Sequence, residues 1–246
     1  ENGALLPLFA WVLNATLLSN LLESKSRASR RFIRAACILP TLAVFAAMAY
    51  MATRPYAFGS REYSMLERLM TQMHVLGDYL LHILMPRLSG SGIYFDDYPV
   101  ARSWTQPIST LLLALGFMAS VAFAIAKRHR FPVLSFGILW YFAGHLLESS
   151  ILDLELFFEH RNYLPLLGSV IPISTLAFRY KTREKLHISL LSIWILLLGS
   201  ITALQAPVWG NTELMANLWA KERPKSLRAT QELAKFRYEN GQRQNA

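Results

Sequence analysis

Three ionisable residues, Glu159, His160 and Arg161, stand together inside the apolar stretch "ELFFEHRNYLPLLG". A guanidinium presents planar donors that suit phosphate or carboxylate, an imidazole can transfer a proton near neutral pH, and a carboxylate can accept one. Pro165 fits early in a helix, where its missing N–H costs little. The pattern predicts a phosphate-binding or proton-transferring cluster exposed at the mouth of a membrane helix. An interfacial salt bridge between Glu159 and Arg161 would explain it equally well.

Two further clusters contain residue types that could do chemistry. In "GIYFDDYP", the paired carboxylates Asp96 and Asp97 could bind a divalent cation or share a proton, although a solvated turn is an equal alternative. In "HLLESS", His145 and Glu148 are three residues apart and share one helix face. Ionisable residues at membrane depth are functional candidates by default, whereas a shallow pair would simply anchor the interface. The sequence has no metal-ligand spacing, phosphate-binding glycine loop or nucleophile elbow.

The composition indicates the elements that must position these clusters. The chain has 246 residues, of which 53% are hydrophobic and 17% are charged, whereas soluble domains carry about 25% charged residues. Six apolar runs approach the length of roughly 17–25 residues that crosses a bilayer as a helix. We therefore expect an all-α polytopic membrane protein with about six transmembrane helices, within Ala4–Leu22, Ala35–Thr53, Pro107–Ala126, Pro132–Leu147, Tyr163–Phe178 and His187–Gln205.

Charge placement predicts the orientation of these helices. Three short connections, Glu23–Arg34, Lys127–Arg130 and Arg179–Leu186, together hold 12 basic residues and two acids. Such loops mark the cytoplasmic face, and the more acidic connections Arg54–Gln106 and Glu148–Asn162 then lie outside. This separation also argues that the net charge of +9 does not serve nucleic-acid binding.

One stretch, Leu66–Met85, is apolar but interrupted by charged residues such as Arg68, Asp78 and His82. We interpret it as an amphipathic helix lying in the outer interface, with these three side chains accessible to water. The alternative is a seventh span, which would move the basic Lys127–Arg130 connection to the outside and so oppose the charge rule.

The remaining chain divides the protein into two predicted parts. Residues 1–205 form the transmembrane domain, and residues 206–246 form a polar helical tail on the outer side. The end of this tail, "LAKFRYENGQRQNA", resembles the first helix of a tetratricopeptide repeat, with Leu233, Ala234, Gly241 and Ala246 at the repeat's spacing and the tyrosine displaced to Tyr238. An ordinary amphipathic helix explains the pattern almost as well, because an array needs further repeats.

The clusters, in this order, resemble a known family. "FEHRNYLPLLG" resembles the "E-R-x-x-Y-L-P" motif of the tetratricopeptide-containing O-mannosyltransferases and their bacterial relatives, which belong to the GT-C superfamily; Glu159, Tyr163, Leu164 and Pro165 match, and His160 replaces the motif's arginine. "ENGALLPLFAWVL" resembles the segment after a "K-E-x-G" motif, and "LMPRLSGSGIYFDDYP" resembles the family's outer loop.

The resemblance implies a bundle of membrane helices with an outer cavity, and transfer of a sugar from a polyprenyl-phosphate carrier to a protein or glycan acceptor. In this interpretation, Asp96, Asp97 and Glu159 are candidate catalytic residues. His160, Arg161, Tyr163, His145 and Glu148 are candidate substrate-binding residues. The protein would be an integral protein of a bacterial inner membrane, with its tail in the periplasm and open to a protein partner. The cofactor is not defined by the sequence, although a divalent cation remains a candidate.

The sequence also departs from the family. The key acid of GT-C enzymes lies in the first outer loop, and we interpret Glu1 as an internal position well past that loop. The catalytic base is therefore expected outside this chain, unless Asp96 or Asp97 takes the role. The alternative is a non-catalytic membrane scaffold or accessory subunit. A transporter is less favoured, because it would want charged residues within its spans, where we find only the uncharged Asn14.

Overall fold

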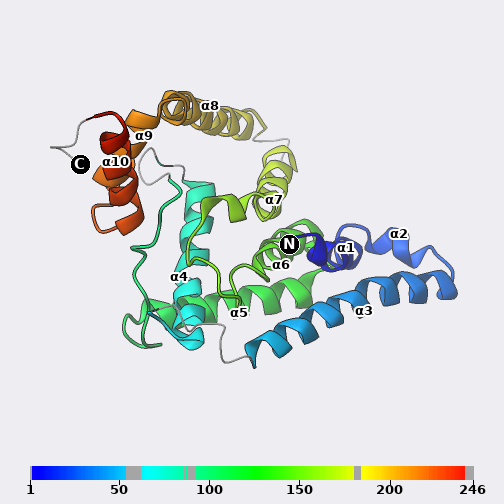
Figure 1. Ribbon diagram of the computed structural model, residues 1–246. Coiled ribbons are helices and arrows are strands. Elements are labelled where there is room, and N and C mark those ends of the chain that lie inside the picture. The colour runs from blue at the N-terminus through cyan, green and yellow to red at the C-terminus, as the bar shows by residue number, and fades with distance from the viewer. Residues whose placement is uncertain (1, 54–61, 86, 88–91, 180–183, 242–246) are drawn as a thin grey trace.

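The computed structural model describes residues 2–53, 62–85, 87, 92–179 and 184–241, and these residues form helices joined by irregular segments with no strand among them (Figure 1). In chain order the helices are η1 (Asn2–Leu5), α1 (Leu6–Ala15), α2 (Ser19–Glu23), α3 (Arg27–Ala52), α4 (Met65–Leu84), α5 (Ser109–Lys127), α6 (Pro132–His145), η2 (Glu159–Asn162), α7 (Leu166–Arg179), α8 (Glu184–Trp209), α9 (Thr212–Glu222) and α10 (Leu227–Glu239).

Three helices are long and apolar enough to cross a membrane by length and composition: α3, α5 and α8 from Lys185 onward. The other predicted spans form shorter helices. Helix α6 and helix α7 have 14 residues each, or about 21 Å at 1.5 Å per residue, against a hydrocarbon core of about 30 Å. The all-helical class is confirmed with three helices of spanning length, and the count of six stays a prediction.

The first predicted span is interrupted. Helix α1 ends at Ala15, and the hydroxyl of the buried Thr16 donates to the carbonyl of Val12 at 2.6 Å. Such a bond offers the backbone an alternative to continuing the helix, and α2 restarts only at Ser19. Helix α3 begins eight residues earlier than its apolar run, because the Ser26 side chain caps its N-terminus by accepting from the backbone N–H of Ser29.

The core lies in two apolar clusters. One joins α1, α3 and α6 around Phe9, Met48, Phe136 and Trp140, with the Phe9 and Trp140 rings 4.3 Å apart. The second joins α4 to α6 and to the segment before η2, and centres on Phe157. Burying these aromatic rings stabilises each cluster, since each ring removes a large apolar area from contact with water or lipid.

Helices α6 and α7 pack most closely where two glycines face one another. A Cβ atom on Gly168 would lie 2.6 Å from the carbonyl oxygen of Gly137, which is closer than such atoms approach. About two turns farther along α6, Gly144 lies against Pro165. The absence of side chains at these glycines lets the two backbones touch, and this contact fixes the ends of the 146–165 connection that carries the candidate site.

Helix α4 runs across the direction of α3 and α5 in Figure 1. The prediction that its charged side chains face water is wrong for Arg68, which is fully buried. Asp78 and His82 are only partly exposed. Eight residues of α4 are buried, so this helix is an internal support rather than a helix resting on the surface.

The polar tail forms the helix pair α9 and α10, at the end of the molecule opposite the connection between α2 and α3 (Figure 1). Side chains of Asn211 and Ser226 cap the two helices. Gly241 follows α10 with a φ of 76°, a left-handed conformation that glycine adopts without strain. Helix α8 continues to Trp209, past the predicted boundary at residue 205. Glu1 and Ala246 lie outside the described residues.

Candidate active site

The candidate site is built on the irregular connection between α6 and α7, whose backbone is held by α4. The guanidinium of Arg68 donates to the carbonyls of Glu148 at 3.0 Å and Ser150 at 2.9 Å, and also to that of Leu154. A non-helical backbone in the interior leaves carbonyl groups that must find donors. A buried arginine with five N–H groups in a fixed fork satisfies three of them at once.

Two more polar side chains of α4 continue this support. Gln72 donates its side-chain amide to the carbonyl of Leu156 at 2.9 Å. The Tyr79 hydroxyl donates to the carbonyl of Phe158 at 3.0 Å and accepts from the backbone N–H of the same residue at 2.7 Å. Side chains of α4 therefore hold the backbone of the connection at five points between Glu148 and Phe158, just before η2 begins.

Arg161 and Glu148 form a buried ion pair. Their Nε and Oε2 atoms are 3.2 Å apart, and the two side chains are 7% and 10% exposed. The geometry is that of an ion pair rather than an aligned hydrogen bond. Arg161 also donates to the carbonyl of Glu155 at 2.6 Å. The prediction that Arg161 is exposed is therefore wrong. Arg161 is buried and holds the connection, and its ion-pair partner is Glu148 rather than Glu159.

His145 also serves the packing of this region. It is 2% exposed, its Nε2 lies 3.2 Å from Oδ1 of Asn162, and its ring stacks on Tyr79 with centroids 5.1 Å apart. The Asn162 side chain in turn donates to the Tyr79 carbonyl at 3.2 Å. The structure thus brings His145, Glu148 and Arg161 together. The contacts of His145 are to the side chain of Asn162 and the ring of Tyr79.

The residues of the motif that do reach the surface are Glu159, His160 and Tyr163. Glu159 is partly buried, His160 is exposed, and Tyr163 is 85% exposed. Burial raises the pKa of Glu159 to about 7, although the nearby Arg223 lowers it. A carboxyl group with a pKa near the working pH is suited to accept or donate a proton.

A cavity of about 320 Å³ opens beside His160 and is lined by Glu148, Asp153, Leu154, Glu155, Phe158, His160 and Arg161. Its lining combines three carboxylates with one arginine that is already paired. His160 is therefore the exposed member that could contribute positive charge toward an anionic group.

Asp96 and Asp97 bind the tail. Asp96 accepts hydrogen bonds from the Ser226 hydroxyl and from the backbone N–H of Arg228, at the N-terminus of α10. Asp97 pairs with Arg223 at 3.2 Å. Their observed partners belong to the helix pair rather than to a shared proton or cation, which disfavours the interpretation of a carboxylate dyad.

Two further contacts join the tail to the site. Arg223 lies over the Phe95 ring, 4.3 Å from its centroid, and Arg228 pairs with Glu155 of the α6–α7 connection. Within the described part of the chain, no group of three or more His, Cys, Asp or Glu residues is arranged to hold a metal ion.

No family model, curated protein or solved structure matches this chain. The resemblance to GT-C enzymes therefore rests on the short motifs of the sequence, and the geometry of the site must carry the functional argument.

Sequence reasoning missed Arg68, Gln72 and Tyr79 as the residues that hold the site. A signal for them exists. These three positions and Val75 follow the spacing i, i+4, i+7 and i+11, which places them on one face of a helix. Polar side chains that share a face with buried apolar ones are expected to be hydrogen-bonded in the interior rather than to meet water.

Proposed function

We propose that this chain belongs to a membrane glycosyltransferase that moves a sugar from a polyprenyl-phosphate carrier to an acceptor at the outer face. In this proposal six helices cross a bacterial inner membrane, with the tail in the periplasm. The observation that carries the proposal is Glu159, a partly buried carboxyl with a pKa of about 7, held beside the exposed His160 and Tyr163 in a motif similar to that of GT-C enzymes.

The proposed chemistry uses Glu159 as the proton acceptor. The acceptor's hydroxyl oxygen forms a bond to the anomeric carbon, the bond from that carbon to the phosphate oxygen breaks, and the hydroxyl proton goes to Glu159. The leaving polyprenyl phosphate carries negative charge, which the exposed His160 would stabilise by donating a hydrogen bond. Arg161 acts as a positioning residue, because its charge is already paired with Glu148.

Glu159 is a better candidate for this role than Asp96 or Asp97. The two aspartates hold Ser226 and Arg223 of the tail, and using either as a base would disturb those contacts. Glu159 instead has a raised pKa whose main cause is burial, the usual way in which proteins adjust a carboxyl for proton transfer near neutral pH.

The test is sugar transfer by the full-length protein in membrane vesicles, supplied with polyprenyl phosphates that carry labelled hexoses. For the wild type we expect a rate that rises with pH through about 7, as Glu159 loses its proton. Glu159→Gln should lower the rate about 10²- to 10⁴-fold, the usual contribution of a general base. Glu239→Gln, at an exposed position of α10, is the matched control and should transfer normally.

Normal transfer by Glu159→Gln would remove the proposed role. Loss of transfer in step with loss of folded protein would assign Glu159 to stability instead, so the amount of folded protein in each membrane sample is measured alongside the rate.

A non-catalytic scaffold is the second candidate. It is favoured by the fact that Arg161, Asp96 and Asp97 are all used in internal contacts. Transfer that is absent from the intact wild-type protein with every donor tested, while the protein still assembles with a membrane partner, would support the scaffold.

A further inference from the structure

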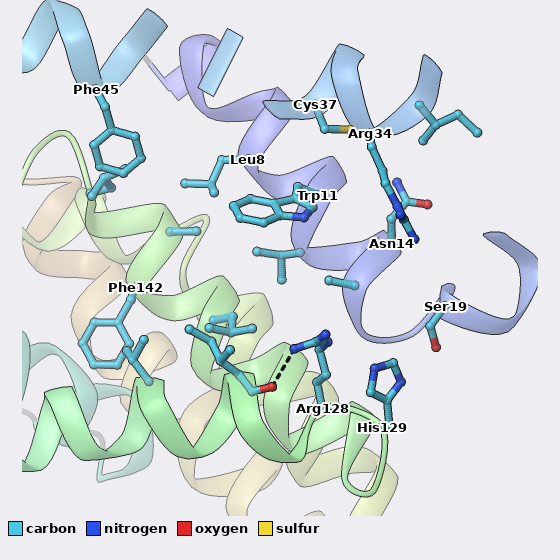
Figure 2. A pocket seen from close by; sticks show the side chains of 18 residues that line it. Leu8, Trp11, Asn14, Ser19, Arg34, Cys37, Phe45, Arg128, His129 and Phe142 are labelled. Carbon is cyan, nitrogen blue, oxygen red and sulfur yellow. Dashed lines mark hydrogen bonds between the residues drawn. The ribbon is translucent and has the colours of Figure 1, made fainter. Parts of the chain in front are cut away.

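A second cavity shares no lining residue with the cavity of the candidate active site. Its volume is about 690 Å³, within the range of roughly 300–1,000 Å³ that is typical of ligand sites. Side chains from α1, α3, α5 and α6 and from the connections near α2 and between α5 and α6 surround it (Figure 2).

The two ends of this cavity differ in chemistry. Figure 2 shows Leu8 and the rings of Phe45 and Phe142 toward one end. The other end gathers the side chains that are polar or basic, which are Asn14, Ser19, Arg34, Arg128 and His129. None of the residues that line the cavity is an aspartate or a glutamate. The cavity is therefore amphipathic along its length and positive at one end.

The two arginines at the polar end have no acid partner among the described residues. Arg34 and Arg128 form no ion pair with any carboxylate in the described part of the chain. One nitrogen of Arg128 donates to the Ile125 carbonyl at 2.8 Å, the contact drawn as a dashed line in Figure 2. Two unpaired guanidinium groups facing a shared space attract an anion, and the planar fork of each suits phosphate.

The surroundings strengthen this attraction. Arg34 ends the basic Glu23–Arg34 stretch, and Arg128 and His129 lie in the basic Lys127–Arg130 connection. Both stretches are of the kind that marks the cytoplasmic face of a membrane protein. Anionic lipids concentrate at that face, and basic pockets between transmembrane helices bind their headgroups.

We propose that this cavity binds an anionic glycerophospholipid, with its phosphate between Arg34, Arg128 and His129 and an acyl chain along the apolar end toward Phe45 and Phe142. A phosphate alone would use only the polar end, and an uncharged lipid would leave both arginines unpaired. Only a lipid that carries a negative headgroup matches both ends. This proposal does not depend on the glycosyltransferase proposal, because the two cavities share no lining residue.

The test is lipid retention by the full chain. The protein is reconstituted with equal amounts of phosphatidylglycerol and phosphatidylcholine and washed in detergent, and the lipids that stay bound are weighed by native mass spectrometry. The wild type should retain phosphatidylglycerol preferentially. The double variant Arg34→Gln/Arg128→Gln should lower that retention about tenfold to a hundredfold, because each cation near an anionic headgroup contributes about one half to one decade of affinity.

The matched control is Arg27→Gln/Arg31→Gln. It removes two positive charges, as the test variant does, and both residues lie in the basic stretch that ends at Arg34. Both side chains are exposed and neither lines the cavity. The control should retain phosphatidylglycerol within about twofold of the wild type. Equal losses in the two double variants would indicate general surface attraction and overturn the proposal.

A second variant, Ala15→Leu, keeps both arginines and narrows the cavity that Ala15 lines. It should lower phosphatidylglycerol retention even where the charge variants cannot be purified. A further arm adds inorganic phosphate in excess, which should leave the bound lipid in place because the apolar end contributes to binding. Unchanged retention in Ala15→Leu, or displacement of the lipid by phosphate alone, would each contradict a lipid site.

Discussion

The buried pair of Arg161 and Glu148 gives the most direct test of how the candidate site is held. Arg161→Met keeps much of the side chain's volume but leaves the Glu148 carboxylate buried without its cation. Removing one partner of a buried ion pair costs about 3–5 kcal/mol, because the remaining charge is uncompensated. The side-chain exposures of 7% and 10% place this pair in that class rather than among surface pairs, so we expect a destabilisation of that size.

The double variant Arg161→Met/Glu148→Leu separates the charge effect from lost packing. With both charges gone no carboxylate is left alone, and the double variant should recover at least about 1 kcal/mol relative to the worse single variant. The assay is equilibrium unfolding of the purified full chain in one detergent, for the wild type, both single variants and the double variant.

The pair of Arg228 and Glu155 provides an internal reference, since its side chains are 51% and 26% exposed. The same cycle there should give a coupling of about 0–1 kcal/mol. The reasoning would be refuted if Arg161→Met cost less than about 1 kcal/mol, or if the buried and the exposed pair gave the same coupling.

Three other outcomes follow from the contacts of this region. Arg68→Met should destabilise the protein by about 3 kcal/mol or more, since it removes a charged donor from three carbonyls, and the bond to the Glu148 carbonyl is fully buried. The control is Arg102→Met, at an exposed position, and an equal effect of the two in thermal unfolding would contradict this. Gly168→Ala should cost about 1–3 kcal/mol, because its methyl group would meet the Gly137 carbonyl at 2.6 Å; an unchanged melting temperature would show that α6 and α7 separate freely. The raised pKa of Glu159 means that the folded state keeps a proton that the unfolded state loses, so stability should fall as pH rises from about 4.5 to about 7. The dependence of the unfolding free energy on pH should therefore be weaker in Glu159→Gln. An identical dependence in the variant and the wild type would contradict a raised pKa of Glu159.

The helices were largely predictable, because apolar runs and charge breaks are local signals. Runs ending near Thr53, Ala126 and Phe178 correspond to α3, α5 and α7. The break after Ala15 was not predicted, because it depends on one Thr16 side-chain bond and on packing rather than on hydropathy. The number of helices that cross the membrane is not readable from length alone, since α6 and α7 are shorter than a bilayer is thick.

The site was predictable in its membership but not in its partners. The chemistry-bearing residues of the "HLLESS" and "FEHRNYLP" stretches do meet, with Glu148 on Arg161. The expected partner, Glu159, was chosen because it is close in sequence. A pair 13 positions apart forms only because the connection folds back on itself, and that path is set by Arg68 from a distant helix. The periodicity of α4 places Arg68 on a buried face, but it does not identify the distant carbonyls that Arg68 binds.

The contacts of the tail have a thermodynamic consequence for the candidate site. Arg223 touches Phe95 and Asp97 and lies close enough to Glu159 to influence its pKa, while Arg228 holds Glu155. A molecule whose binding moves Arg223 away from Glu159 would remove a positive charge that lowers the pKa of this carboxyl, and would so favour its protonated form. By reciprocity, a change in the charge of Glu159 must shift the affinity for that molecule by the same factor. Binding at the tail and protonation of Glu159 are thus thermodynamically coupled through Arg223.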